Sequence, residues 1–326
     1  NFTHAKMARR MAQIEESVGR YLRQLDSADR QEPSEAISIK TTRIKEKIAR
    51  LKQEMSRLEV LDAQMRNTPD QQISLTDPDA RSMATSGRGS GVVGYNVQVA
   101  VDTEHHLIVT HEVINVGNDR GQLARMSKQA KEVLEVDKLD AVADRGYFDG
   151  EEILACEEAG VAVTLPKPMT SNAKAEGRFG KQDFAYLPDE DVYRCPSGQQ
   201  LPYHFTNIEH GMTLRRYWST AACQGCAIKS QCTPSKERRI TRWEHEHVVE
   251  EVQRRLDSNP DAMRTRRETV EHPFGTIKAR MGATHFLMKR LRNVAAEMAL
   301  HVLAYNLTRV MNIVGKPSLI AAIRAA

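Results

Sequence analysis

Asp144 is the first residue whose surroundings could support chemistry. It directly follows a short apolar run at residues 139–143, and Gly146 lies two residues later. An acidic residue at the C-terminal edge of an α/β sheet is where metal and phosphate chemistry is commonly built. The same position also suits an aspartate that only caps a turn or a helix. The local sequence leaves both interpretations open.

Glu271 forms a second candidate together with two cations. Arg267, Glu271 and Lys278 are spaced by four and seven residues, so in a continuous helix all three project from one face. A carboxylate between two cations suits a metal-bound phosphodiester, because the carboxylate holds the ion and the cations contact phosphate oxygens. An exposed ion pair along a helix would give the same spacing.

Basic residues concentrate around this glutamate. Residues 261–292 carry eight basic and three acidic side chains, a local net charge of +5 that exceeds the +4 of the whole chain. Such a patch favours contact with the phosphates of DNA, although charged runs are also common on solvated faces. The candidate DNA contacts nearest to the glutamate are Arg264, Arg267, Lys278 and Arg280.

Four of the five cysteines form a third constellation, a Cys-Pro-x-Gly stretch followed by Cys-x2-Cys-x5-Cys. They are Cys195, Cys223, Cys226 and Cys232. A Cys-x2-Cys pair lets two thiolates reach one ion, and two further cysteines close a tetrahedral site. We interpret the set as a zinc site, with an iron–sulfur cluster and unligated thiols as alternatives. Four protein ligands leave no open position on the ion, so this zinc would be structural.

The first 70 residues are predicted to form an antiparallel helical hairpin. Apolar residues repeat there at spacings of three and four in two separate runs. These are Met7, Met11, Ile14, Val18, Tyr21 and Leu25, then Ile44, Ile48, Leu51, Met55, Leu58 and Met65. Pro33 and its polar neighbours predict a turn at 29–34. The expected role of this coiled-coil arm is packing or dimerisation, and DNA contact through its basic face is the alternative.

The residues after the hairpin follow an α/β order. Alternating or apolar patterns predict two strands, a helix, a strand, a helix and a strand between residues 95 and 165, which indicates a partly parallel sheet. Helical patterning resumes at about residue 244, with a break near 259–260. The predicted division is a hairpin at 1–70, a first core part at 71–168, a four-cysteine insertion at 169–242 and a second core part at 243–326.

Composition excludes several classes of protein. The chain has 326 residues, enough for one large or two modest domains, and its mean hydropathy is −0.53. No apolar run approaches the roughly 18 residues that a spanning helix needs, so a membrane protein is excluded. Five cysteines are too few for a disulfide scaffold. The net charge alone identifies no partner.

Residues 72–314 resemble the catalytic part of bacterial insertion-sequence transposases of the DDE superfamily. Five stretches in a fixed order carry the resemblance: Asp77-Pro-Asp-Ala-Arg, Gly94-Tyr-Asn-Val-Gln-Val-Ala-Val-Asp102, Ala143-Asp-Arg-Gly-Tyr-Phe, Val270-Glu-His-Pro-Phe-Gly-Thr-Ile-Lys278 and Leu303-Ala-Tyr-Asn-Leu-Thr-Arg309. The family's second acidic residue matches Asp144, and its glutamate matches Glu271. Its Tyr-x2-Arg-x3-Glu-x6-Lys signature matches at Arg267, Glu271 and Lys278, whereas Arg264 stands where the family has tyrosine.

The resemblance implies a fold and an activity. The fold is an RNase H-like mixed sheet with flanking helices, and the activity is metal-dependent DNA cleavage and strand transfer. Asp144 and Glu271 would hold two Mg²⁺ or Mn²⁺ ions, and the DNA partners would be terminal inverted repeats and target DNA. The family also implies a homo-oligomeric transpososome in the bacterial cytoplasm, at the nucleoid. Similar cysteines occur in the family's insertion before the glutamate helix.

The family's first catalytic aspartate has no clear counterpart in this chain. In close relatives it lies on the first strand, in an Asp-Gly-Ser/Thr-Lys stretch before the helical hairpin, and no such stretch occurs here. The chain opens with Asn1, so we expect a processed or N-terminally truncated protein that lacks this carboxylate and is catalytically incomplete. Asp77 and Asp79 are the in-chain substitutes, and a turn is the alternative for both.

Two other functions compete with the transposase interpretation. One is a non-catalytic DNA-binding or assembly relic that keeps the coiled-coil arm and a structural zinc module. The other is a metal-dependent nuclease unconnected with transposition, which would cleave DNA but not join it.

Overall fold

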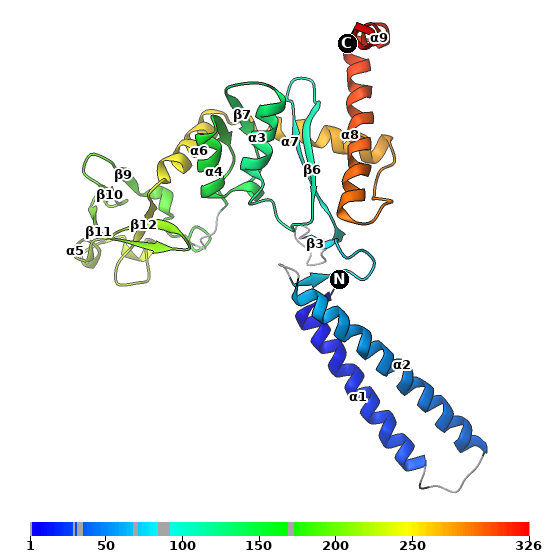
Figure 1. Ribbon diagram of the computed structural model, residues 1–326. Helices are drawn as coiled ribbons and strands as arrows, with labels where there is room; N and C mark the ends of the chain where they lie inside the picture. Colours follow the sequence, from blue (N-terminus) through cyan, green and yellow to red (C-terminus); the bar gives the residue numbers. More distant parts are fainter. Residues whose placement is uncertain are drawn as a thin grey trace. The chain divides into compact units, whose positions relative to one another are not determined.

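The chain is a mixed α/β protein, as its sequence predicts (Figure 1). The computed structural model describes residues 2–28, 30, 35–67, 71–83, 92–168 and 173–325. They divide into two compact units, the first made of Asn1–Gln98, His111–Asn118 and Thr276–Ala326, the second of Val99–Thr110 and Asp119–Gly275. In these described ranges, no helix is long and apolar enough to cross a membrane.

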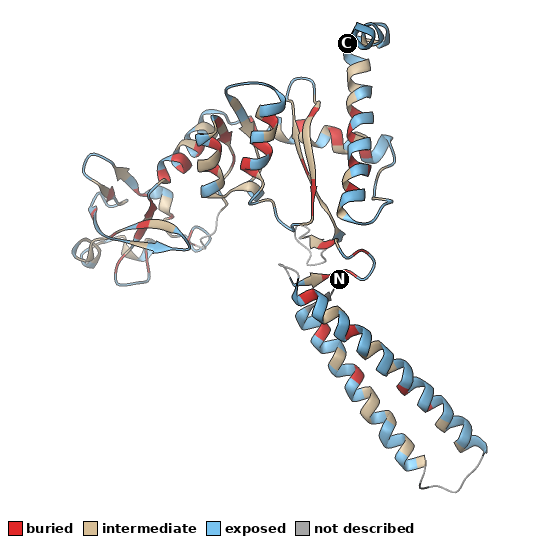
Figure 2. Cartoon of the chain, viewed as in Figure 1, coloured by how far each residue is buried: buried red, intermediate tan, exposed pale blue. Residues whose placement is uncertain are grey.

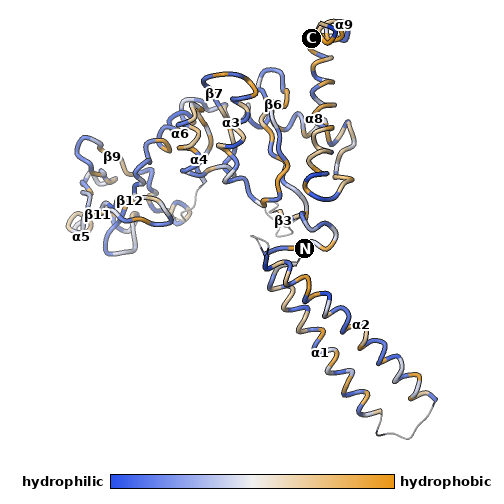
Figure 3. Tube along the Cα trace, viewed as in Figure 1, coloured by the Kyte–Doolittle hydropathy of each residue, from blue (hydrophilic) through white to orange (hydrophobic). Residues whose placement is uncertain are grey.

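The first unit begins with a helical hairpin made of α1 (His4–Ala28) and α2 (Glu35–Arg66). Apolar side chains of the two helices pack together along the seam. Buried residues recur among exposed ones along both helices, and hydrophobic residues among hydrophilic ones (Figures 2 and 3). The buried seam residues are Met7, Ile14, Ile44, Ile48, Leu58 and Met65. Arg10 pairs with Glu54 across the hairpin at 2.8 Å, which requires antiparallel helices. The predicted turn at 29–34 lies, apart from one residue, outside the described residues.

The rest of the first unit contains short strand pairs and two C-terminal helices. Strand β1 pairs with β2, and β3 pairs with β4. Their bounds are β1 (Phe2–Thr3), β2 (Gln72–Ile73), β3 (Arg81–Met83) and β4 (Val92–Gly94). A π turn, η4 (Thr276–Arg280), precedes α8 (Leu291–Val314) and α9 (Lys316–Ala325). Gly315 separates these two helices with a φ of 81°, a conformation that glycine adopts without strain.

The second unit contains the strands and helices of the predicted α/β core. Strands β7 (Leu139–Val142) and β8 (Val161–Thr164) run parallel, with Leu139 opposite Val161. Helices α3 (Leu123–Val133) and α4 (Gly150–Glu158) cover them and share their buried core. The preceding strands, β5 (Asn96–Val101) and β6 (Ile108–Ile114), pair with each other.

The described strands therefore do not form the single mixed sheet that the sequence predicts. Strands β5 and β6 make one two-stranded sheet, and β7 and β8 make another. Both strands of the second pair have only four residues, so the hydrogen-bonded ladder is short. The parallel pairing itself was predicted correctly.

A five-stranded antiparallel sheet occupies most of the predicted insertion, in the order β13-β12-β11-β10-β9. Its strands are β9 (Ala185–Leu187), β10 (Val192–Arg194), β11 (Gln200–Glu209), β12 (Met212–Tyr217) and β13 (Ile240–Trp243). Its short helical elements are η2 (Lys181–Asp183), α5 (Thr220–Gln224) and η3 (Lys229–Gln231). The sheet has its own core of Phe184, Tyr193, Leu201, Tyr217 and Ile240.

Two helices follow this sheet and end the second unit. Helix α6 (Glu246–Ser258) buries three valines in the same core as β8, and α7 (Ala262–Gly275) contacts β7. The break predicted at 259–260 separates them. Pro273 lies inside α7, which ends two residues later at Gly275, and the π turn η4 follows directly.

Candidate functional site

Asp144 lies just beyond the carboxyl end of β7 and caps the 3-10 turn η1 (Arg145–Tyr147). Its Oδ1 accepts a hydrogen bond from the backbone N–H of Gly146 at 2.8 Å. Its Oδ2 lies 2.8 Å from Nη2 of Arg266, a residue of α7. The Asp144 side chain is nevertheless 42% exposed. The cap interpretation is confirmed, and the carboxylate still reaches solvent where the strand ends.

A second carboxylate, which the sequence did not single out, borders the same place. Asp119 lies in the loop between β6 and α3. A Cβ atom built on Gly146 would lie 2.9 Å from Oδ1 of Asp144 and 3.4 Å from Oδ2 of Asp119. Burial raises the pKa of Tyr147, and the negative charges of Asp119 and Asp144 raise it further. Two carboxylates therefore face one small space that only the absence of a side chain at residue 146 keeps open.

Helix α7 presents an arginine, and not its glutamate, to Asp144. Arg266 belongs to the partly buried side of the helix, near the buried Thr269 and Pro273. Glu271, five residues after Arg266, is exposed. Arg267, four residues before Glu271, is exposed as well. In the described parts of the chain, Glu271 forms no ion pair and no side-chain hydrogen bond. The structure thus brings Arg266 to Asp144 and leaves Glu271 open to solvent.

The remaining predicted DNA contacts are Arg264, near the start of α7, and Lys278 and Arg280, in the π turn that follows this helix. Arg264 is exposed and lies 3.3 Å from Asp261. Lys278 and Arg280 are exposed in the π turn η4, which belongs to the first unit. The seven-residue spacing to Lys278 assumed a continuous α-helix, whereas α7 ends at Gly275. The spacing argument therefore applies to Arg267 but not to Lys278.

The side chains of Asp77 and Asp79 accept hydrogen bonds from backbone N–H groups at the start of α8. Asp77 is buried and accepts hydrogen bonds from the hydroxyl of Tyr95 at 2.6 Å and from the backbone N–H of Arg290 at 3.2 Å. Oδ2 of Asp79 accepts a hydrogen bond from the backbone N–H of Leu291 at 3.0 Å. Burial raises the pKa of Tyr95, and its hydrogen bond to Asp77 raises it further. The two aspartates fix the chain where α8 begins.

Comparison with known families identifies the segment that carries Glu271. Residues 194–311 match the family described as the transposase DDE domain. This segment is similar to a transposase DDE domain. The match confirms the resemblance to DDE transposases and includes Arg267, Glu271 and Lys278, whereas Asp144 lies before it. No curated protein and no solved structure matches the chain.

The four cysteines of the matched segment, residues 194–311, line one cavity together with Lys229 and Arg238. Burial raises the pKa of Cys232; Arg238 acts against this rise, and the other three thiols add to it. The thiol of Cys195 lies 3.0 Å from the hydroxyl of Ser197. In the described ranges, no three His, Cys, Asp or Glu side chains are arranged as a metal-binding group. The thiols share a cavity but do not form a ligand shell.

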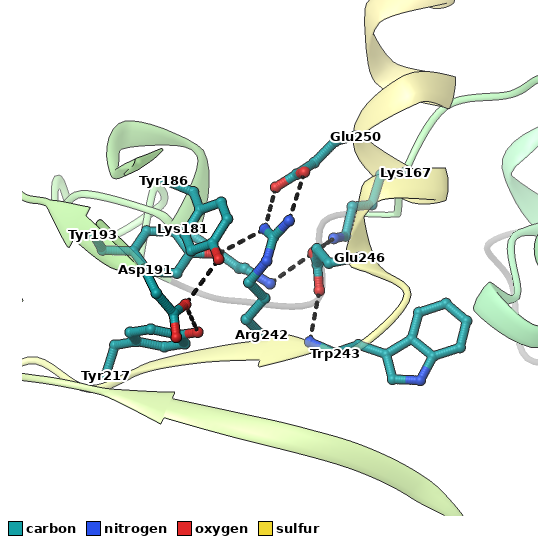
Figure 4. A network of polar contacts seen from close by, with 10 residues as sticks. All are labelled: Lys167, Lys181, Tyr186, Asp191, Tyr193, Tyr217, Arg242, Trp243, Glu246 and Glu250. Carbon is teal, nitrogen blue, oxygen red and sulfur yellow. Dashed lines mark hydrogen bonds and ion pairs between the residues drawn. The ribbon is translucent and has the colours of Figure 1, made fainter. Parts of the chain in front are cut away.

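A polar network joins the five-stranded sheet to α6 within the second unit (Figure 4). Glu246 lies 2.6 Å from Nζ of Lys181 and 3.6 Å from Nζ of Lys167, and accepts a hydrogen bond from the N–H of Trp243. Burial alone raises the pKa of Glu246, but the two lysines and this N–H outweigh it, so the pKa is lowered.

Arg242 completes the network on β13. Its Nη2 donates to Oε2 of Glu250 at 2.9 Å, and its Nη1 donates to the hydroxyl of Tyr193 at 3.2 Å. Burial raises the pKa of Tyr193 to about 12. The charged groups of this network are thus paired with one another. The network holds α6, the helix before α7, to the sheet.

Proposed function

We propose that the chain catalyses metal-dependent cleavage and strand transfer at the DNA ends of an insertion sequence. The observation that carries the proposal is the exposed carboxylate of Asp144, beside Asp119, in a chain whose residues 194–311 match a transposase DDE domain. DDE transposase domains use divalent metal ions. Asp144 and Glu271 are the proposed ligands, and an RNase H-like arrangement of the core is the proposed fold.

The residues at Asp144 fit a hard divalent cation. Mg²⁺ and Mn²⁺ favour carboxylate oxygens, and Mg²⁺ commonly keeps several waters while it binds one or two carboxylates. The space at Gly146 offers oxygens of two carboxylates and remains accessible to solvent. When bound in a pair, such ions activate the attacking oxygen and stabilise the leaving oxygen of a phosphodiester.

The side chains of this chain would orient the metal and the DNA. The N–H of Gly146 fixes one oxygen of Asp144, which leaves the other for exchange between partners. Arg267 shares the exposed face of α7 with Glu271, so the two can meet one phosphate from one side of the helix. Lys278 and Arg280 add positive charge for backbone contact.

The prediction that Asp77 supplies a metal-binding carboxylate remains a prediction. Its contacts with Tyr95 and with the backbone of Arg290 favour a structural role. Both of its oxygens already accept hydrogen bonds, and metal binding would have to replace them.

The direct test is an assay of strand cleavage and joining on the element's terminal repeats, with Mg²⁺, using the product of the complete reading frame. We expect both activities, and a loss of at least about 100-fold for Asp144→Asn and for Glu271→Gln. Full activity of both variants would contradict the assignment. DNA binding without cleavage would favour the assembly relic, and cleavage without joining would favour a nuclease.

We also propose that the four cysteines hold a structural Zn²⁺. Four thiols on one cavity provide the donor set that zinc prefers, and the lining Lys229 and Arg238 would offset the negative charge of a tetrathiolate site. Metal analysis should find one zinc per chain, lost in Cys226→Ser but kept in Cys156→Ala, since Cys156 is buried in the separate α/β core. A metal-free protein with four reactive thiols in this cavity would refute the zinc proposal.

A further inference from the structure

The contact between Arg266 and Asp144 is unexpected for the family signature, which assigns the phosphate-contacting arginine to position 267. Arg266 is instead the residue that reaches the carboxylate, at 2.8 Å. The two side chains come from elements 122 residues apart in sequence, so the pair is a tertiary contact and not a local helix pair. The cation of α7 nearest to the proposed metal ligand is thus already in contact with it.

The surroundings of this pair favour a second cation. Asp119 faces the same space at Gly146 as Oδ1 of Asp144, so a second carboxylate lies beside the one that Arg266 contacts. Tyr147 is close enough to respond to the charges of all three groups. A divalent ion in the place of the guanidinium would bring two positive charges to Asp144 instead of one.

The pair is also accessible enough to open. The side chain of Arg266 is 24% exposed and that of Asp144 is 42% exposed. Ion pairs with this degree of exposure contribute little to stability, so their exchange costs little. The pair of Glu246 with Lys181 in the same unit is different. The Glu246 side chain is only 10% exposed, although that of Lys181 is 36% exposed, so removing the lysine would leave a buried carboxylate with less compensation.

We propose that Arg266 is a placeholder cation: it occupies Oδ2 of Asp144, beside Asp119, in the metal-free protein and leaves it when a divalent ion binds. This inference rests on the proposed function, because it assumes that Asp144 is a metal ligand. It assigns Asp119 to the same metal site. Released from Asp144, the guanidinium becomes available to a phosphate on the DNA beside the ion.

The test is the binding of Mn²⁺ alone to the full chain, measured by calorimetry and by the electron paramagnetic resonance signal of free Mn²⁺. Arg266→Gln removes the competing charge, so Mn²⁺ should bind about tenfold more tightly than to the wild type. Asp119→Asn should bind about tenfold more weakly. Arg266→Lys keeps the charge and should stay within about twofold of the wild type.

Arg267→Gln is the matched control, because Arg267 is the exposed neighbour on the same helix and has no contact with Asp144. Its affinity for Mn²⁺ should remain that of the wild type. An unchanged or weaker affinity in Arg266→Gln, while Asp144→Asn abolishes binding, overturns the placeholder and leaves the proposed function standing. Binding that Asp144→Asn does not alter overturns both.

Discussion

Two pairs of aspartates in this chain differ in what satisfies their oxygens. Asp77 and Asp79 accept hydrogen bonds from a tyrosine hydroxyl and from backbone N–H groups at the start of α8. Asp119 and Asp144 border an open space at Gly146. Oδ1 of Asp144 accepts one backbone hydrogen bond, and its Oδ2 contacts a partly exposed arginine. The first pair lies in the first unit and the second pair in the second unit.

The difference separates structural from chemical carboxylates. A backbone N–H cannot leave its acceptor without opening the local chain. An aspartate oxygen bound in this way therefore stabilises the fold and cannot readily take another partner. A guanidinium on a long side chain can swing away, so its carboxylate partner can exchange it for another cation. By this criterion Oδ2 of Asp144, which contacts Arg266, is suited to bind a metal, whereas its Oδ1 is fixed by the N–H of Gly146. Both oxygens of Asp77 accept hydrogen bonds from the N–H of Arg290, so Asp77 is suited to hold α8.

The largest effect on stability should come from removing the carboxylate of Asp77. Asp77→Ala leaves the Tyr95 hydroxyl and the Arg290 N–H without an acceptor, so we expect a loss of about 3 kcal/mol in the free energy of unfolding. Asp144→Ala should cost only about 1 kcal/mol, because it breaks an exposed ion pair and one cap hydrogen bond. Urea unfolding followed by circular dichroism measures both. Equal losses of unfolding free energy in the two variants would contradict the distinction between the two pairs of aspartates.

Glu297 extends the comparison to a third carboxylate of the first unit. It accepts hydrogen bonds from the N–H groups of Leu287 and Met288, both at 2.9 Å. Burial alone raises its pKa, but these N–H groups and His301 outweigh it, so the folded pKa lies below the ordinary value of 4.5. Its stabilisation is therefore complete at neutral pH and is lost as the pH falls through the folded pKa.

Glu297→Gln should accordingly lower the unfolding free energy at pH 7 by about 1.5 kcal/mol. The difference from the wild type should shrink between pH 6 and pH 3, which thermal unfolding at several pH values can follow. Glu271→Gln is the control, because Glu271 is exposed and has no such contacts. A difference that stays constant over this pH range would argue against the carboxylate's role.

The smallest predicted effect on stability concerns Gly146. An alanine there would place its Cβ 2.9 Å from Oδ1 of Asp144, which forces the carboxylate to shift. We expect a loss of about 1 kcal/mol, together with weaker Mn²⁺ binding, since the shifted oxygens border the proposed ion. Gly121→Ala is the matched control, because its Cβ would meet no atom within 4 Å. Unchanged Mn²⁺ affinity in Gly146→Ala would place the ion elsewhere.

The sequence predicted those parts of the fold that depend on periodicity. The two apolar runs of the hairpin became the seam of α1 and α2, and the parallel pair β7–β8 followed from its strand–helix–strand order. The five-stranded sheet was missed. Its core depends on tyrosines such as Tyr193 and Tyr217, and β11 is mostly exposed, so no alternating apolar pattern marked these strands.

The site was only partly predictable, for two physical reasons. Asp119 precedes a helix, where an aspartate ordinarily acts as a cap, and only tertiary structure brings it to Gly146. Helical spacing correctly grouped Arg267 with Glu271, but it could not tell which face of α7 meets β7. The structure shows that Arg266 occupies the side that reaches Asp144.

The most direct test of this account compares Mn²⁺ binding to the wild type, Asp144→Asn and Asp77→Asn in one calorimetric series. Asp144→Asn should lose at least about tenfold in affinity while remaining as stable as the wild type. Asp77→Asn should keep the wild-type affinity and unfold more easily. Loss of Mn²⁺ binding in Asp77→Asn, with Asp144→Asn unaffected, would contradict the assignment of the two aspartate pairs.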